Sequence, residues 1–198
     1  QDPEELVSIH LKILSSTDDD SVRRLVLIFL GRFFCLIKSN QIDLSSEISE
    51  FIQNSLFSLF QNENFTNNFD YLAYDIYKCA DYYQEKWPQL PELLFELIIS
   101  NSDFSSSALN CLSDCISSRC IDIDSYFDLF YNYIGETLLS TPESNLSKIS
   151  SLLRLVYSLA KSKNYQPKEI FIPLFDQIPN YLEYSFNCED SCRIINDF

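Results

Sequence analysis

The sequence predicts an all-α protein in which pairs of antiparallel helices repeat along the chain and stack into a solenoid. Only two of the 198 residues are glycine, although sheet proteins use glycine freely in hairpins and bulges. Apolar residues recur at helical spacing in one segment after another. Alternate segments begin roughly 35 to 47 residues apart, which is the period of a helical-hairpin repeat. We therefore expect residues 1–198 to form one α-solenoid of about five helix pairs.

Ten helices and no strand are expected, and many of their starts are marked by capping residues or by proline. Asp20 and Ser21 precede Val22, and Asp43 precedes Leu44; Asp and Ser side chains accept hydrogen bonds from the free N–H groups of a first helical turn. Further starts are marked by Ser102 with Asp103, by Thr141 with Pro142, and by Pro167. The expected helices cover residues 3–15, 20–38, 43–61, 65–83, 88–100, 103–118, 123–139, 143–162, 167–185 and 189–198.

The helix expected at 20–38 is apolar on nearly every side. Its apolar residues are Val22, Leu25, Val26, Leu27, Ile28, Phe29, Leu30, Phe33, Phe34, Leu36 and Ile37. Such a helix must be covered by more than one neighbour. Because each pair in a solenoid packs on the pair before it and the pair after it, the repeat architecture supplies that cover.

The segment EKWPQLPELLFELIIS, residues 85–100, contains the start of the helix expected at 88–100. Pro88 and Pro91 both fall in its opening turn, where the missing N–H has no intrahelical partner to lose. The chain's one tryptophan, Trp87, is expected to hold the incoming chain against the body of the protein.

The charge of the chain excludes some partners and favours others. A formal net charge of −15 opposes nucleic acid, because binding to phosphates depends on lysine and arginine. The same charge favours a basic protein through long-range attraction, although acidity also serves solubility alone. No apolar stretch reaches the roughly 18 residues of a membrane span, so membrane insertion is not expected.

No enzymatic motif is present, so no catalytic residue and no cofactor are expected. The chain contains no glycine-rich phosphate loop and one histidine, His10. Glu47 with Glu50, and Asp124 with Asp128, lie one helical turn apart. That spacing could serve acid–base chemistry, but without a pocket signature the four carboxylates are interpreted as solvated faces.

The cysteines are expected to be reduced core residues of a cytosolic or nuclear protein, since their number is odd and most fall at apolar positions of helical patterns. A metal site is the alternative, because Cys111, Cys115 and Cys120 lie close together in the sequence, as do Cys188 and Cys192. No CxxC pair occurs, however. The cysteines are Cys35, Cys79, Cys111, Cys115, Cys120, Cys188 and Cys192.

Three pieces of the chain are informative in their order and spacing. They are DSVRR at residues 20–24 leading to LGRFF at 30–34, WPQLPELLFEL at 87–97, and SAL at 107–109. Together they resemble the N-terminal HEAT repeats of the importin-β (karyopherin-β) nuclear transport receptors, and most of all the importin-5-like subgroup. Ser106 and Ser107 stand where the family has arginine and glutamate, and Gly31 stands within its leucine–arginine–arginine motif, so the resemblance does not carry over the family's ion pairs between repeats.

The resemblance implies a two-layer, right-handed HEAT-repeat superhelix that forms the N-terminal part of a longer receptor. Such receptors bind cargo and GTP-bound Ran on a concave inner face and phenylalanine–glycine nucleoporins on an outer face, and they shuttle between cytoplasm and nucleus. The expected partners are therefore Ran-GTP, basic cargo proteins and these nucleoporins. The alternative is a HEAT-repeat scaffold of a cytosolic enzyme complex, similar to phosphatase scaffolds, with no role in transport.

The helices at 43–61, 88–100 and 123–139 are assigned to the inner layer, and each carries a polar stripe. The stripes consist of Glu47, Glu50, Asn54, Gln89, Glu92, Glu96, Asp124, Asp128, Asn132 and Glu136. One such stripe is typical of a solvated helix face. Three on successive stacked helices predict a continuous, concave acidic surface for a basic partner.

The helix at 65–83 is rich in aromatic residues, which offer a second kind of surface. They are Phe65, Phe69, Tyr71, Tyr74, Tyr77, Tyr82 and Tyr83. A repeat protein buries one face of every helix, so most of these rings are expected in the core. None is assigned as a nucleoporin site.

Overall fold

The structure, a computed structural model, describes residues 2–84, 87–100, 104–140 and 145–162. Within these ranges every regular element is a helix, which confirms the all-α class for this part of the chain. The elements are α1 (Pro3–Ser16), α2 (Asp20–Ser39), α3 (Ser46–Phe60), η1 (Glu63–Asn68), α4 (Phe69–Tyr83), α5 (Leu90–Ile99), α6 (Ser105–Ser117), η3 (Asp124–Tyr126), α7 (Phe127–Ser140) and α8 (Leu146–Lys161), where η denotes a 3-10 helix. The helices expected at 167–185 and 189–198 lie outside the described residues.

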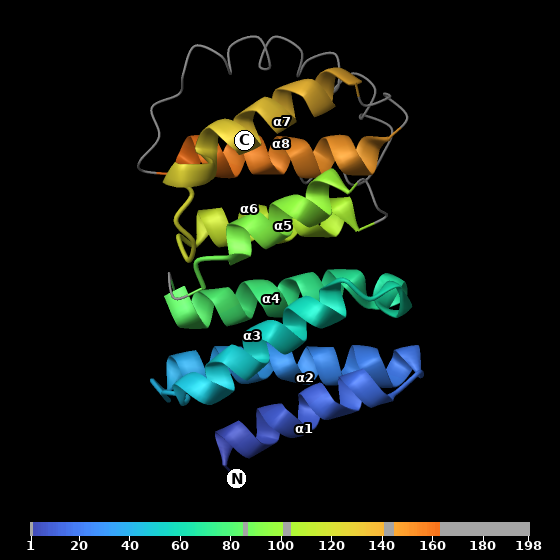
Figure 1. The fold of residues 1–198 in the computed structure, drawn as a ribbon, viewed down its shortest axis with the longest axis vertical. Coiled ribbons are helices and arrows are strands. Elements are labelled where there is room, and N and C mark those ends of the chain that lie inside the picture. Colours follow the sequence, from blue (N-terminus) through green and yellow to red (C-terminus); the bar gives the residue numbers. More distant parts are fainter. Residues whose placement is uncertain (1, 85–86, 101–103, 141–144, 163–198) are drawn as a thin grey trace.

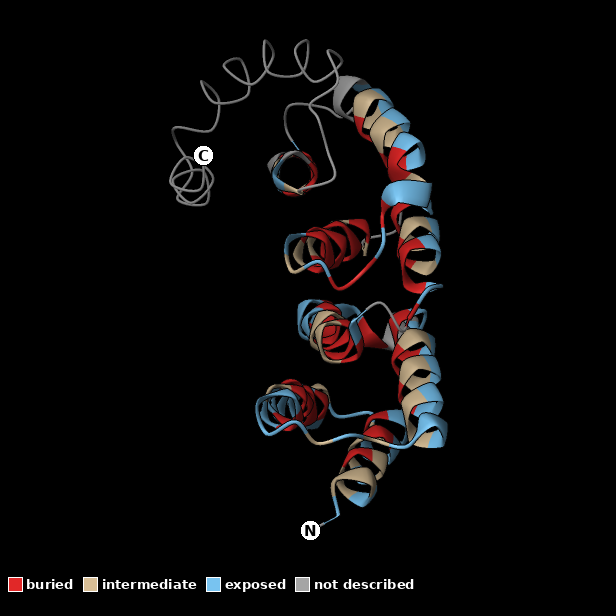
Figure 2. Ribbon diagram, turned by 90° about the vertical axis from the view of Figure 1, so that its left-hand side faces the viewer, coloured by how far each residue is buried: buried red, intermediate tan, exposed pale blue. Residues whose placement is uncertain are grey.

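The helices form antiparallel pairs that stack along the long axis of the molecule (Figure 1). The pairs are α1–α2, α3–α4, α5–α6 and α7–α8. The even-numbered helices make one layer and the odd-numbered helices the other, and Figure 2 shows the stack bowed, with the odd layer on the outside of the bend. The even-numbered neighbours approach one another far more closely than the odd-numbered neighbours do, which places the even layer on the inside.

The helix starts follow local capping, with small corrections to the sequence prediction. Asp19 caps α2, since its Oδ1 accepts hydrogen bonds from the backbone N–H groups of Ser21 at 2.8 Å and Val22 at 3.3 Å. The third helix begins at Ser46 and not at 43, because Ser45 supplies the cap. The helices expected at 65–83 and 123–139 each begin with a 3-10 turn before the α-helix starts.

Polar contacts between successive helix pairs repeat at the period of the pairs. Asn67 Nδ2 donates to Asp20 at 2.7 Å across 47 residues, and Ser107 Oγ donates to Asp70 at 2.7 Å across 37 residues. Arg154 pairs with Asp114 across 40 residues. These separations agree with the period of roughly 35 to 47 residues that the sequence predicts.

The apolar helix α2 is only partly covered. Its face toward α4 is buried, but Leu25 is 53%, Phe29 48% and Leu36 61% exposed on the side away from α4. The expectation of cover on every side is therefore wrong for this helix. The reason is its place in the stack, since α1 and α2 form the first pair of the described residues and have a neighbouring pair on one side.

The expected role of Trp87 agrees with its position. Its side chain is 4% exposed and belongs to the core, and its carbonyl accepts a hydrogen bond from the N–H of Leu90, the first residue of α5, at 3.2 Å. Pro91 lies in the first turn of α5 and Pro88 just before the helix. The segment therefore starts the helix and fixes its approach to the core.

At Gly31 of α2, side chains of α4 lie close to the helix backbone. A Cβ placed on Gly31 would lie 2.6 Å from Asp75 Oδ1 and 3.0 Å from Tyr74 Cε1. Asp75 is 1% exposed, so its carboxyl has little space into which it could move. By contrast, a Cβ on Gly135 in α7 would meet no atom within 4 Å.

We therefore predict opposite effects for the two glycine-to-alanine changes. Gly31→Ala should lower the free energy of unfolding by roughly 1 kcal/mol or more, since overpacking costs more than the gain in helix propensity. Gly135→Ala should raise it by up to about 1 kcal/mol, because only the propensity gain remains. Urea unfolding of both variants measures the difference; a stabilised Gly31→Ala protein would contradict the close packing of α2 on α4.

Candidate functional site

All ten predicted stripe residues are exposed at the surface. Glu47, Glu50 and Asn54 lie on α3. Gln89 directly precedes α5, and Glu92 and Glu96 lie on it. Asp124 lies in η3, and Asp128, Asn132 and Glu136 lie on α7. The three groups therefore belong to one layer, the odd-numbered helices, and to successive pairs of the stack (Figure 1). This shared layer is what the sequence predicts for them.

The prediction that this surface is concave is wrong. The odd-numbered helices lie on the outside of the bend in Figure 2, so the stripes occupy the convex side. The physical reason lies in the spacing within each layer, because the helices that approach most closely define the inside of a bow. In the outer layer a large ring fills the wider gap, since Phe95 of α5 packs against Phe130 and Tyr133 of α7 at centroid distances of 5.4 and 5.6 Å.

Positive charge is distributed unevenly between the layers. Helices α3, α5 and α7 contain no lysine or arginine, whereas α2, α4 and α8 carry several. Those of the even layer are Arg23, Arg24, Arg32, Lys38, Lys78, Lys148, Arg154 and Lys161. The convex surface of α3, α5 and α7 thus carries carboxylates and no lysine or arginine from these helices to balance them. Its electrostatic field favours a basic partner.

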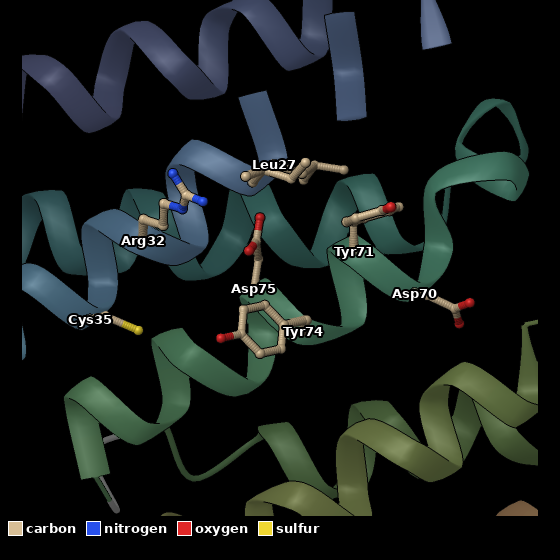
Figure 3. A pocket seen from close by; sticks show the side chains of 8 residues that line it. Leu27, Arg32, Cys35, Asp70, Tyr71, Tyr74 and Asp75 are labelled. Atoms are coloured by element: carbon tan, nitrogen blue, oxygen red, sulfur yellow. The ribbon is translucent and has the colours of Figure 1, made fainter. Parts of the chain in front are cut away.

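A second feature is a cavity of about 390 Å³ on the even layer, between α2 and α4 (Figure 3). Charged, aromatic and apolar side chains line it together. The lining residues are Leu27, Ile28, Arg32 and Cys35 of α2, and Asp70, Tyr71, Tyr74 and Asp75 of α4. Figure 3 shows Asp75 of α4 pointing toward α2, with the side chain of Asp70 directed away from that helix.

The floor of this cavity is the carboxyl group of Asp75. The residue is 1% exposed, and its Oδ2 atom has no hydrogen-bond partner among the described residues. Burial raises the pKa of the Asp75 carboxyl well above its ordinary value. The missing side chain of Gly31 creates the space in which this carboxyl lies.

One cation lines the cavity and two others contact its rings, and none of the three forms an ion pair within the described part of the chain. Arg32 lines it directly. The guanidinium of Arg24 lies 5.5 Å from the ring centre of Tyr71, and the ammonium of Lys78 lies 5.1 Å from that of Tyr74. Aromatic faces therefore hold two of the cations at the edge of the cavity.

Sequence reasoning missed this cavity. It expected most rings of the fourth helix in the core, and Phe65, Phe69 and Tyr83 are buried as expected, but Tyr71 and Tyr74 are 38% and 48% exposed. An available signal was the aspartate at position 75, which stands among apolar residues of a helix that packs on both sides. The contact between Gly31 and Asp75 cannot be inferred from the sequence, because it depends on the register of α2 against α4.

The described cysteines are free thiols, as expected for core residues. They are Cys35, Cys79, Cys111, Cys115 and Cys120; Cys188 and Cys192 lie outside the described residues. Hydrogen bonds with Cys111 and Cys120, together with burial, raise the pKa of the Cys115 thiol well above its ordinary value. This thiol therefore stays protonated and packs as a small apolar group.

Comparisons with protein-family models, with curated proteins and with solved structures find no match to this chain. In the described ranges, no helix has both the length and the apolar character that crossing a membrane demands. The functional argument therefore rests on the two surfaces themselves.

We predict that the buried carboxyl makes stability depend on pH. Because the folded-state pKa of Asp75 is raised, the folded chain keeps the proton to a higher pH than the unfolded chain does. Stability is therefore lost as the pH rises from about 4 toward that raised pKa. Asp75→Asn removes the loss, so its melting temperature relative to wild type should increase by a few degrees between pH 4 and pH 7.

The exposed loop residue Asp43 supplies the control for this experiment. Asp43→Asn should show no comparable change in relative melting temperature between the two pH values, since its carboxyl is solvated. A constant difference between Asp75→Asn and wild type from pH 4 to pH 7 would contradict a buried, unpartnered carboxyl at position 75.

Proposed function

We propose that this chain is a HEAT-repeat α-solenoid whose outer acidic layer binds a basic protein, as part of a nuclear transport receptor of the importin-β type. The observation that carries the binding proposal is the segregation of charge. Helices α3, α5 and α7 expose acidic and amide residues on successive pairs and contain no lysine or arginine. The antiparallel pairs and the contact period near 40 residues support the repeat assignment.

The strength of such a surface comes from many weak interactions. One exposed ion pair is worth roughly 0.2–1 kcal/mol, and salt screens it. Several stripe carboxylates facing one basic partner act mainly on the association rate and on the salt dependence of binding. The surface therefore suits a partner with a broad basic patch and does not need a deep pocket.

In the transport proposal, the partners are Ran-GTP, basic cargo and phenylalanine–glycine nucleoporins, and the protein shuttles between cytoplasm and nucleus. The motif order of residues 20–34, 87–97 and 107–109 supports it. The resemblance implies Ran on a concave face, whereas the acidic stripes lie on the convex side. The stripe is therefore proposed for a basic partner in general, and Ran binding is proposed separately.

The convex position of the stripes favours a second candidate. A HEAT-repeat scaffold of a cytosolic enzyme complex can present its outer surface to a basic subunit, with no role for nucleotide. The two candidates differ in one property, which is whether binding depends on the nucleotide that Ran carries.

We predict that the chain captures Ran loaded with a non-hydrolysable GTP analogue at least tenfold better than Ran-GDP. The measurement is a pull-down with the immobilised 198-residue chain and equal amounts of each form. Equal capture of both forms, or of neither, would favour the scaffold over the transport receptor.

We also predict that charge reversal on the stripe weakens binding of basic ligands. Glu50→Lys with Glu96→Lys removes two attractions and adds two repulsions on neighbouring outer helices. A labelled lysine decapeptide should lose roughly three- to tenfold in affinity at physiological salt. The difference should grow at lower salt, where screening is weaker.

The matched control reverses two exposed loop carboxylates, Asp18→Lys with Asp43→Lys, which gives the same net charge. Its affinity should fall less than that of the stripe variant, and circular dichroism should show both variants folded. Equal losses of affinity in the two variants would mean that net charge alone governs binding, and would contradict the proposal that the stripe is a binding site.

A further inference from the structure

We propose that the cavity between α2 and α4 binds the carboxylate group of a ligand, with Arg32 as the pairing cation. This inference concerns the even layer, and it does not depend on the proposed role of the acidic outer layer. It rests on charge, on an unpartnered buried group and on the shape of the cavity.

The first step is the charge around the cavity. Arg32 is the cation among the residues that line the cavity. Elsewhere, Arg23, Lys38 and Arg154 form ion pairs. Within the described ranges Arg32 forms no ion pair, although it lines a cavity whose rings are also contacted by the cations of Arg24 and Lys78.

The acidic residues of the lining do not neutralise these cations. Asp70 is exposed and accepts the hydrogen bond of Ser107 at 2.7 Å. Asp75 is buried and without a partner at Oδ2, and its burial favours the protonated form. Because Asp70 accepts a hydrogen bond from Ser107 and Asp75 is buried, Arg32 is the charged group of the lining that a ligand can pair with.

The second step is the hydrogen bond that Asp75 lacks. A protonated carboxyl has one O–H to donate and therefore suits an acceptor in the cavity. A cationic ligand would require Asp75 to ionise in a buried position and would also face Arg32. A ligand oxygen that carries negative charge avoids both the ionisation of buried Asp75 and the repulsion by Arg32.

The third step is the shape and lining of the site. The cavity of about 390 Å³ accommodates a small molecule or one side chain. Apart from the charged groups it offers Leu27, Ile28 and the rings of Tyr71 and Tyr74, which suit a short apolar stem. The planar guanidinium of Arg32 matches a planar carboxylate through two parallel hydrogen bonds.

A carboxylate on a short stem has two sources, a free carboxylic acid or a glutamate side chain of a partner segment. A titration followed by the side-chain Nε–H signal of Arg32 in nuclear magnetic resonance distinguishes them. Butyrate represents the free acid, and an acetylated and amidated Ala-Glu-Ala peptide represents the side chain. Inorganic phosphate and butylammonium test the other ligand chemistries.

We expect butyrate or the peptide to shift the Arg32 signal saturably, and the tighter of the two identifies the source. Butylammonium should leave the signal unchanged, and phosphate should bind more weakly than the better carboxylate. A saturable response to butylammonium, tighter binding of phosphate, or no saturable response to either carboxylate would overturn the proposal.

Three variants test the assigned roles, with binding followed by the backbone N–H signals of Tyr71 and Tyr74. Arg32→Gln should weaken carboxylate binding at least tenfold, because the charged partner is lost. Arg119→Gln, a matched change at an exposed site on another part of the surface, should leave binding unchanged. Asp75→Asn keeps a donor of similar shape and should retain affinity within about threefold.

The Asp75→Asn result separates the two possible ligand charges. Loss of all ligand binding in this variant, with its fold intact by circular dichroism, would mean that an ionised Asp75 attracts a cation and would overturn the proposal. Unchanged affinity in Arg32→Gln would do the same, since the site would then bind without its assigned cation.

Discussion

The structure depends on one constraint, which is that no helix pair can bury its apolar faces alone. Each pair must pack against its neighbours, and the hydrophobic core runs continuously from Val7 of α1 to Leu159 of α8. Hydrogen bonds across 37 to 47 residues accompany this packing between successive helix pairs. The partly exposed α2 shows what the constraint means in the first of the described pairs, where Leu25 and Phe29 are about half exposed.

The same stacking determines where the two candidate surfaces lie. Close approach of the even helices bends the stack and leaves the odd layer on the convex side, where the acidic stripes face solvent. Within the even layer, Gly31 allows α4 to bring Asp75 beneath α2 and opens the cavity beside it. One surface is thus broad and acidic, and the other is a small cavity lined by Arg32 together with aromatic and apolar side chains.

Helix positions and the fact that the acidic stripes share one layer were predictable, because capping residues, prolines and apolar spacing act locally. The direction of the bend was not, because it depends on how closely side chains such as Phe95 let neighbouring helices approach. The cavity was not predictable either. It requires the register of α2 against α4, which places Gly31 opposite Asp75 although they are far apart in sequence.

The central claim is that contacts between successive pairs stabilise each pair, and the stacked rings of Phe69 in α4 and Phe104 beside α6 test it most directly. Their centroids lie 3.8 Å apart with an interplanar angle of 11°. A double-mutant cycle with Phe69→Leu and Phe104→Leu, measured by urea unfolding, should give a coupling energy of about 0.5–1.5 kcal/mol. A coupling energy of zero within error would contradict the stacked arrangement of the helix pairs.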